Sequence, residues 1–572
     1  MKKFLIIIFV WFLSLFLFRQ ILFNMDAVLV DWHDYPLIVS LIWQYTQNLP
    51  SLDFSQLFYF PMFYPQANAL LFSDLFLVHG FLASMLSLFS NNNILVFNIL
   101  FFLTLLLNSI AAFTLWQSFF SRASTLFFAT LTTALSPYFF LQLSHFQMIS
   151  FWPFLFILAI LLKKKVNQLE LYVLASLLVI QFLTSVYLWL FAGIAIFCCL
   201  LVQVPEFWQD KKLSKWQFRK LIAILLSLIL ISPLLWQYSQ VKKSHSVNIS
   251  QEQLLVNSAQ ISDYLLNFLP HTLLDESRIY VFLKQLNHNQ RGEAAVFPGL
   301  VLFSLGVLGF WKKRKRPYFA KASQDKKIFW FFASLVALGL IFSLGPRCQV
   351  NDWYCRVPLP YWGVIKIFPF LDTFDAIARW SFLFYLGFSY FASLGLGSLI
   401  ENKKKLQQYL IISGLTMVYM AEVFPVFAFY RTVDYFTPVH EYLQSACSSS
   451  TKVILRYPLD QRNGFVVLES LQARSIDLLA ASRHQCHLTN GYSGLAPVDY
   501  TQLEAELNSY FTAKNFENFL NLIKNKDTNY LQVKHDFLDK KINQNWLDWV
   551  ENQEKLIQVA KDEQSTLYLL TN

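Results

Sequence analysis

Charged residues are scarce in this sequence. Only 14% of its 572 residues are Asp, Glu, Lys or Arg, whereas 55% are hydrophobic, and the mean hydropathy is +0.41. Such a composition excludes an ordinary soluble globular domain. Runs of about 20 apolar residues, the length that crosses a bilayer, recur along most of the chain. The sequence therefore predicts a polytopic α-helical membrane protein.

Three further features are missing from the sequence. There is no Gly-rich phosphate loop between a predicted strand and a predicted helix, so nothing in the sequence requires a nucleotide. There is no internal repeat that relates the two halves, although such repeats are usual in transporters. There is no small-residue cleavage site after the apolar N-terminus "MKKFLIIIFVWFLSLFLF". We therefore predict an uncleaved signal-anchor at about residues 4–24.

The basic residues gather in short gaps between the apolar runs. The net charge is +10, but clusters in such gaps are typical of cytoplasmic loops. The excess of basic over acidic residues therefore indicates the orientation of the chain in the membrane and not a nucleic-acid partner. The clusters are Lys2–Lys3, Lys163–Lys165, 211–220, 312–316 and Lys403–Lys405.

An arrangement of about 11 transmembrane helices places all these clusters in the cytoplasm. It puts the N-terminus in the cytoplasm and predicts outer loops at 25–92, 239–293 and 346–376. Within the first loop, 35–47 and 73–90 are expected to be helices that lie in the outer interface. The predicted transmembrane domain covers residues 1–430. After the signal-anchor, its spans are expected at 94–119, 123–141, 146–163, 169–185, 187–204, 217–237, 295–311, 327–345, 378–400 and 407–429.

The composition changes at about residue 431 to that of a soluble domain. The segments "TKVILRYPL", "TNYLQVKH" and "STLYLL" have the β-branched and aromatic character of strands. Helical patterns lie at 499–510, 513–524 and 536–557. We predict that residues 431–572 form an extracytoplasmic α/β domain. Together with the predicted spans, this describes a multi-pass protein of the inner (plasma) membrane.

The cysteines agree with this arrangement. Cys198 and Cys199 fall within a predicted span, where they are expected to be small apolar residues. The other four fall in predicted outer regions, where an oxidising compartment permits disulfides. The candidate pairs are Cys348 with Cys355 and Cys447 with Cys486.

Ionisable side chains gather in the predicted outer regions, most densely in "DWHD" directly after the first span. Such groups at a membrane surface are costly and suggest function. A carboxylate can take a proton from a hydroxyl group, and an Arg side chain can neutralise a departing phosphate. The candidates are Asp31, His33, Asp34, Asp74, His79, His145, Asp263, His271, Arg278, Arg291, Glu293, Arg379 and Glu422.

The order of several segments resembles the GT-C superfamily of integral membrane glycosyltransferases, in particular its uncharacterised bacterial branch. The first segments are "DWHDYPLIVSLIWQ" and "FYPQANALLFSDLFLVHG", which follow the first span. Others are "SPYFFLQLSHFQMISFWPF", "NSAQISDYLLNFLP", "EAAVFPGLVLFSLGVLG", "LPY…FPFLDTFDAIARW" and "NGYSGLAPVDYTQLEAEL". Members of that branch often carry Arg-x-x-x-Arg near "IARW", whereas this chain has only Arg379 there.

The resemblance implies a GT-C fold and the transfer of a sugar from a polyprenyl-phosphate carrier to an acceptor at the outer face. The acceptor could be a glycan, a lipid or a protein. A carboxylate of the first outer loop would be the catalytic base of an inverting reaction, and Asp34 is favoured over Asp31. The substrate-binding residues would be His33, Asp74, His79, His145, Asp263, Glu293 and Arg379. His145 would lie near the donor phosphate or the sugar.

Other interpretations stay open at this point. Asp34 followed by Pro36 is typical of a helix N-terminus, so Asp34 could simply cap that helix. The "D-x-H-D" group could bind a divalent metal, although no cofactor is required. The chain could instead transport or flip a lipid-linked substrate, or act as a non-catalytic envelope assembly protein.

Overall fold

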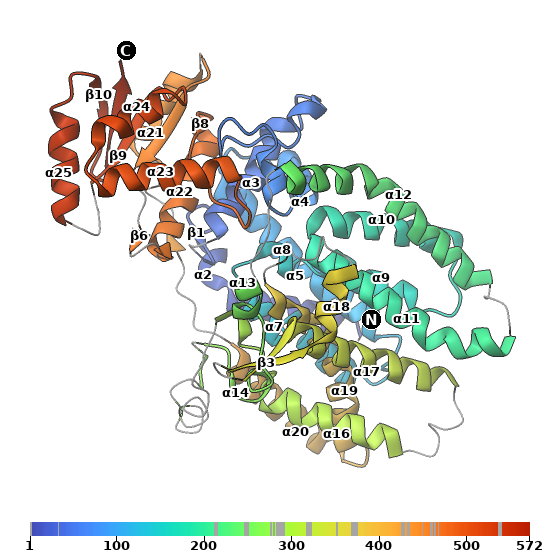
Figure 1. Cartoon of the computed structure of the whole chain (residues 1–572). Helices are drawn as coiled ribbons and strands as arrows, with labels where there is room; N and C mark the ends of the chain where they lie inside the picture. Colours follow the sequence, from blue (N-terminus) through green and yellow to red (C-terminus); the bar gives the residue numbers. More distant parts are fainter. Residues whose placement is uncertain are drawn as a thin grey trace. The chain divides into compact units, whose positions relative to one another are not determined.

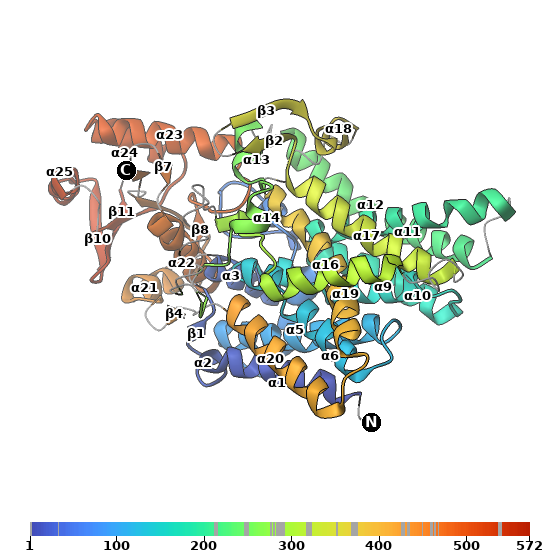
Figure 2. The same ribbon diagram turned by 90° about the horizontal axis from the view of Figure 1, so that it is seen from below.

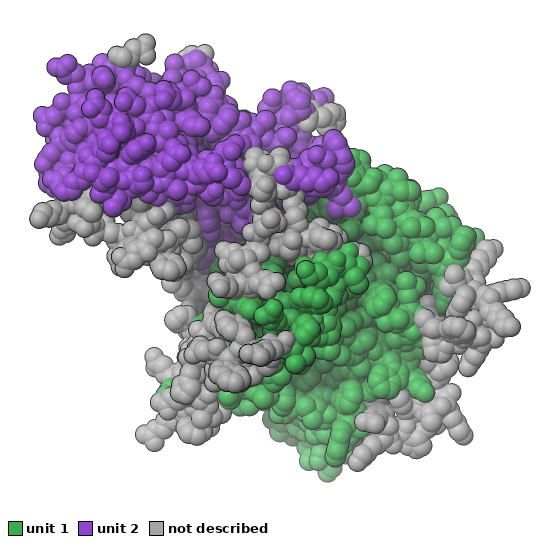
Figure 3. Space-filling model, viewed as in Figure 1, with its two compact units in different colours: residues 1–19, 101–234, 248–428 green, residues 20–100, 235–247, 429–572 purple. Residues whose placement is uncertain are grey.

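The computed structural model describes most of the chain. The described residues are 3–31, 34–210, 215–244, 251–270, 272–274, 277, 281, 292–315, 323–350, 353–367, 374, 376–424, 430–431, 435–448, 450–457, 461–462, 465–466, 468–535 and 540–571. The chain divides into two compact units (Figure 3). Unit 1 contains residues 1–19, 101–234 and 248–428, and unit 2 contains residues 20–100, 235–247 and 429–572.

Unit 1 is built almost entirely from helices (Figure 1). They are α1 (Leu5–Leu17), α6 (Ala123–Ala134), α7 (Pro137–Leu141), α8 (Phe146–Ile149), α9 (Trp152–Leu161), α10 (Gln168–Thr184), α11 (Val186–Asp210), α13 (Gln251–Val256), α14 (Asp263–Leu266), α16 (Leu300–Lys315), α17 (Ser323–Ser343), α18 (Pro360–Ile367), α19 (Ser381–Ile400) and α20 (Lys405–Val423). The 3-10 turns η3 (Gly292–Ala294) and η6 (Ile377–Trp380) and the antiparallel hairpin of β2 (Arg347–Val350) and β3 (Trp353–Pro358) complete it.

Helix α19 forms the centre of unit 1, because α6, α16 and α17 all pack against it (Figures 1 and 2). Glycines allow the backbones of α16 and α19 to approach closely. A Cβ atom at Gly395 would lie 2.1 Å from the carbonyl oxygen of Leu305, and one at Gly309 would lie 1.9 Å from that of Phe391. Small residues at such contacts are a common basis of helix packing in membranes.

Among the described residues, five helical segments are long and apolar enough to cross a membrane. They are Asn93–Trp116, Ala123–Leu141, Gln217–Val241, Lys326–Ser343 and Ile377–Ile400, and shorter apolar helices accompany them. Two of these segments lie in α5 (Asn93–Trp116) and α12 (Lys215–Ser244). Both helices, like α2 (Arg19–Leu22), begin in one unit and end in the other along the chain. Each span predicted from the sequence coincides with one or two helices, but the number of 11 spans stays a prediction.

We call the stretch 25–92, which was predicted to be the first outer loop, the outer segment. Unit 2 combines this segment with the C-terminal part of the chain. The outer segment contributes β1 (Val28–Leu29), α3 (Tyr35–Asn48), η1 (Phe54–Gln56), η2 (Ala69–Phe72) and α4 (Leu77–Leu86). The C-terminal part contributes β4 (Tyr430–Arg431), α21 (Pro438–Ser448), β5 (Val453–Tyr457), β6 (Gln461–Arg462), β7 (Phe465–Val466), α22 (Leu468–His484), β8 (His487–Leu488), α23 (Val498–Thr512), α24 (Phe516–Lys524), β9 (Tyr530–Lys534), α25 (Lys540–Glu551), β10 (Leu556–Lys561) and β11 (Ser565–Leu570).

Five strands of the C-terminal part form one mixed sheet with the order β10-β11-β9-β5-β8. Strand β5 is parallel to β8 and β9, whereas β9, β11 and β10 pair antiparallel. Helices α23, α24 and α25 pack on this sheet around a core that includes Tyr457, Phe519, Leu531 and Trp546.

The first outer segment is joined to the C-terminal part by direct pairing. Strand β1 pairs with β4, and α3 packs against both α4 and α22. The sequence placed a domain boundary at residue 431, close to the last segment of unit 2. It did not predict that residues 20–100 would belong to the same compact unit.

Candidate active site

Three predicted site residues come together in unit 1. His145 precedes α8, Glu293 lies in η3 and Arg379 lies in η6. The Nη2 atom of Arg379 donates hydrogen bonds to Nε2 of His145 at 2.9 Å and to Oε1 of Glu293 at 3.2 Å. Gln142, which follows α7, donates to the other oxygen of Glu293 at 3.3 Å. We call these four residues the Arg379 cluster.

The hydrogen bonds of the Arg379 cluster define its charges. A guanidinium group has only donors, so Nε2 of His145 must accept, which places the proton of the neutral ring on Nδ1. Burial would raise the pKa of Glu293, but the positive charge of Arg379 and the hydrogen bonds from Arg379 and Gln142 lower the pKa to about 2. Glu293 is therefore an ionised partner of Arg379 at neutral pH.

Arg379 also contacts an aromatic ring. Its guanidinium carbon lies 5.2 Å from the centre of the Tyr187 ring, within the range of a cation–π interaction. Its side chain is only 10% exposed, compared with 33% for Glu293. The cluster thus offers a positioned, largely desolvated cation, the kind of group that stabilises a developing negative charge.

Asp263 is held by hydrogen bonds within its own turn. It is buried and accepts hydrogen bonds from the backbone N of Gln260 at 2.7 Å and from Asn267 Nδ2 at 3.2 Å. Asn267 also donates to the carbonyl of Ala294 at 2.8 Å, directly after Glu293. Asn267 thus links Asp263 to the turn that carries Glu293. The predicted contact of Asp263 with substrate stays a prediction.

The predicted catalytic carboxylates Asp31 and Asp34 lie in unit 2. Asp34 is at the N-cap position of α3, with Pro36 in the first turn, but its side chain makes no capping hydrogen bond. Instead its Oδ1 atom accepts a hydrogen bond from the Tyr492 hydroxyl at 3.2 Å. Asp31 accepts one from the backbone N of Asp34 at 3.4 Å. The structure therefore does not bear out helix capping as the complete explanation for Asp34.

Tyr492 is a stable hydrogen-bond donor to Asp34. Burial and the nearby carboxylates of Asp34 and Asp31 raise the pKa of its hydroxyl, so the proton stays on Tyr492. The segment around it is held by Ser493, whose hydroxyl donates to the carbonyl of Phe72 at 2.6 Å. Arg474 and Glu504, which pair at 2.6 Å, lie on the neighbouring helices α22 and α23.

Asp74 and His79 also lie in unit 2. Asp74 is half-buried beside Tyr238, whose hydroxyl donates to the carbonyl of Ser73 at 2.9 Å. His79 is buried in α4, with its ring 6.3 Å from that of Phe76. Their roles as substrate-binding residues stay predictions. His33, His271, Arg278 and Arg291 lie outside the described residues.

Two further predicted features concern metal ions and disulfides. Within the part of the chain that the structure describes, no group of three or more His, Cys, Asp or Glu side chains could hold a metal ion. Cys447 and Cys486 form a disulfide with a Cα–Cα distance of 5.4 Å. The side chain of Cys355 lies outside the described residues, so its pairing with Cys348 stays a prediction.

Sequence reasoning missed Gln142, Tyr187 and Tyr492 as members of these two groups of residues. Gln142 and Tyr492 stand inside the quoted segments "SPYFFLQLSHFQ" and "NGYSGLAPVDY", so the signal was present in the pattern. Gln and Tyr side chains are common throughout a protein. Only tertiary packing shows which of them face a charged group.

Solved structures with a similar fold cover nearly the whole chain. The arabinofuranosyltransferase AftD from Mycobacteria matches with a TM-score of 0.56 at 11% identity, over 99% of this chain and 40% of its own. The Archaeoglobus fulgidus oligosaccharyltransferase matches with a TM-score of 0.50 at 11% identity, over 93% of this chain and 69% of its own. The chain thus spans well under half the length of AftD.

Both structures are GT-C membrane glycosyltransferases, so the predicted GT-C resemblance is confirmed at the level of the fold. No curated protein matches the sequence. A family model described as a domain of unknown function (DUF6311) matches residues 5–423. Because this match covers most of the chain, the protein belongs to the DUF6311 family.

Proposed function

We propose that this protein is a membrane glycosyltransferase that moves a sugar from a polyprenyl-phosphate carrier to an acceptor at the outer face of the membrane. The observation that carries the proposal is the GT-C fold, which extends over 99% of the chain in the match to AftD.

The proposed reaction requires a base. We assign this role to Asp34, with Asp31 as the alternative. The carboxylate takes the proton of the acceptor hydroxyl, and the acceptor oxygen attacks C1 of the donor sugar with inversion. The hydrogen bond from Tyr492 to Asp34 supports the assignment, since it turns the carboxylate away from a capping position and fixes its orientation.

The reaction also requires stabilisation of the leaving group. As the bond between C1 and the phosphate oxygen breaks, the polyprenyl phosphate gains negative charge. We assign Arg379 to that charge, with Glu293 and His145 holding its guanidinium group in place. A bidentate guanidinium group suits phosphate oxygens, and its low exposure strengthens the interaction.

The test is sugar transfer from radiolabelled polyprenyl-phosphate sugars to cell-envelope acceptors. Membranes would contain the wild type, Asp34→Asn, Asp31→Asn or Arg379→Gln. We expect one of the two Asn variants to lose transfer by at least about 10²-fold, the usual contribution of a general base. Arg379→Gln should lower the rate by about 10²–10³-fold, as the loss of a charge-stabilising donor does.

Asp53→Asn is the matched control, because Asp53 is an exposed carboxylate of the same outer segment whose oxygen accepts from Ser55. It should transfer as fast as the wild type. Transfer that is equally fast in both Asn variants, with the wild type active, would rule out the assigned base.

A further inference from the structure

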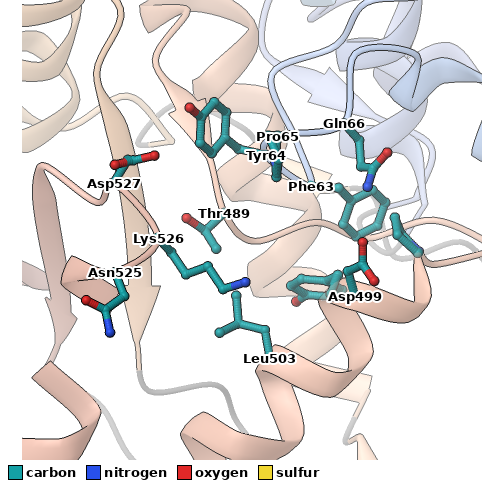
Figure 4. A pocket seen from close by; sticks show the side chains of 12 residues that line it. Phe63, Tyr64, Pro65, Gln66, Thr489, Asp499, Leu503, Asn525, Lys526 and Asp527 are labelled. Carbon is teal, nitrogen blue, oxygen red and sulfur yellow. The ribbon is translucent and has the colours of Figure 1, made fainter. Parts of the chain in front are cut away.

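Unit 2 contains a pocket of about 150 Å³ that the proposed catalytic groups do not use (Figure 4). Three chain segments build it: the loop 63–66, the stretch 489–503 and the turn 525–527. Its lining includes Tyr64, Gln66, Thr489, Asp499, Lys526 and Asp527. We call it the Thr489 pocket, because Figure 4 shows Thr489 between the residues of the loop and those of the turn.

The walls of the Thr489 pocket are fixed by backbone contacts. The backbone N atoms of Phe63 and Tyr64 donate to the carbonyls of Asn490 at 3.1 Å and Leu488 at 2.9 Å. Gly491 leaves room for this approach, since a Cβ atom there would lie 2.2 Å from the Phe63 ring. The pocket is therefore part of the packed structure of unit 2.

Two residues that line the Thr489 pocket have a strained backbone. Phe63 and Asp527 both have a φ of 56°, in the left-handed region that non-glycine residues rarely adopt. Such strain persists only where the surrounding structure enforces it, and it gathers at ligand-binding sites. The surrounding structure therefore holds the backbone of both lining residues in place.

One residue of the lining, Thr489, has a buried hydroxyl group. The Oγ1 atom of Thr489 makes no hydrogen bond to any residue that the structure describes, and the residue is only 3% exposed. The backbone of Thr489 is fixed, because its N atom donates to the carbonyl of Ile454 at 2.9 Å. A buried hydroxyl without a partner is unfavourable, so a ligand that reaches it gains a hydrogen bond.

The charges of the lining residues restrict the ligand. Lys526 contributes one positive charge and Asp499 and Asp527 two negative ones, so the lining has a net charge of −1. This disfavours phosphates and carboxylates. Carboxylates, amides and a hydroxyl group around an aromatic ring instead suit a ligand with several neutral hydroxyl groups, which can donate to the carboxylates and lie against Tyr64.

We propose that the Thr489 pocket binds a neutral sugar ring of the acceptor, an assignment that rests on the proposed glycosyltransferase function. The stretch 489–503 links the pocket to the proposed base. It carries Thr489 and Asp499 in the pocket wall and, between them, Tyr492, which donates to Asp34. An acceptor glycan held in the pocket is therefore bound by the same segment that orients the base.

The test measures binding of the purified full-length protein, in detergent, to an immobilised panel of neutral oligosaccharides. Soluble neutral sugars, glucuronic acid and inorganic phosphate serve as competitors. Thr489→Val keeps the shape of the side chain and removes its hydroxyl, and Asp499→Asn changes an exposed carboxylate with little risk to folding. Each should weaken binding of the captured oligosaccharide by about tenfold.

Glu506→Gln is the matched control, because Glu506 is an exposed acid of the same helix α23 outside the pocket. It should bind like the wild type. Neutral sugars should displace the bound oligosaccharide, whereas phosphate should not. Absence of binding to every probe, equal binding by both pocket variants, or displacement by phosphate would each overturn the proposal.

Asp34→Asn separates this proposal from the proposed activity. It should keep full oligosaccharide binding while it loses transfer. If the activity is wrong and the pocket is right, binding depends on Thr489 although no protein transfers sugar. If the activity is right and the pocket is wrong, both pocket variants transfer with an unchanged KM for the acceptor.

Discussion

Glu293 is an acid whose ionised form is favoured by folding. Its pKa of about 2 lies below the ordinary value of 4.5, so the folded protein binds its proton less tightly than the unfolded chain. The stabilisation that results is complete above the ordinary pKa and is lost as the pH falls towards about 2. The thermal midpoint of the wild type should therefore decrease as the pH is lowered below about 5.

Glu293→Gln tests this dependence, because glutamine keeps the shape of the side chain and cannot ionise. At neutral pH the variant should unfold at a lower temperature than the wild type, since Arg379 loses its charged partner. The difference between the two midpoints should shrink as the pH falls from about 6 to 3. Glu506→Gln provides the baseline, and a Glu293→Gln difference that stays constant over this range would contradict the linkage.

The residues of the Arg379 cluster could be predicted better than their contacts. Their types and their common location follow from the charge rule and the order of the spans, and His145, Glu293 and Arg379 indeed meet. The contacts could not be predicted, because they depend on turns such as η3 and η6 that have no periodic signal. The same is true of Asp263, a residue whose type fits catalysis equally well but which hydrogen bonds within its own turn.

At the scale of the element, helix α16 begins against a carboxylate from another helix. Glu422 of α20 accepts hydrogen bonds from the backbone N atoms of Leu300 at 3.0 Å and Val301 at 3.1 Å. Gly299 precedes them with a φ of 85°, and a Cβ atom there would lie 2.8 Å from Glu422. The carboxylate thus satisfies donors that the helix itself leaves without partners.

Glu422→Ala should therefore lower the free energy of unfolding by about 1–3 kcal/mol, because it leaves buried N–H groups without acceptors. Glu422→Gln, which keeps one oxygen acceptor, should cost less. Thermal unfolding in detergent measures both, with the exposed Glu401→Ala as a comparison. Equal stability of Glu422→Ala and the wild type would show that water satisfies this helix start.

The elements differ in how well the sequence predicted them. Long apolar runs form helices within a few residues of the expected bounds, as for α5, α10 and α17, because the length and hydropathy of a run are enough to predict such a helix. Strands β5, β9 and β11 were expected from their β-branched residues. The first two residues of strand β10 fall within the helix predicted at 536–557. A bulge between Gln558 and Ala560 interrupts the regular alternation of this strand, so its sequence lacks a clear strand pattern.

At the scale of the whole molecule, the basic clusters predict the orientation of the chain in the membrane. A reporter that folds only outside the cytoplasm, such as alkaline phosphatase, should be active when fused at the C-terminus and inactive when fused after Lys315. The disulfide between Cys447 and Cys486 agrees with an extracytoplasmic C-terminal part, because such bonds persist in oxidising compartments.

A second reporter that is active only in the cytoplasm, such as green fluorescent protein, provides the control at both positions and should give the opposite result. An active alkaline phosphatase after Lys315 would place the cluster 312–316 outside and refute the arrangement. Replacement of that cluster by neutral residues tests its contribution directly, since fewer basic residues weaken the signal that keeps the loop inside.

The division of unit 2 among distant stretches of the chain also governs the order of biogenesis. Asp34 and its partner Tyr492 are separated by 458 positions. A ribosome that adds about 5–20 residues per second needs roughly 20–90 s to reach the second from the first. During that interval the emerging outer segment has no C-terminal sheet or α22 to dock on and is exposed to chaperones and proteases. The nascent chain therefore cannot orient Asp34 through Tyr492 until translation is nearly complete.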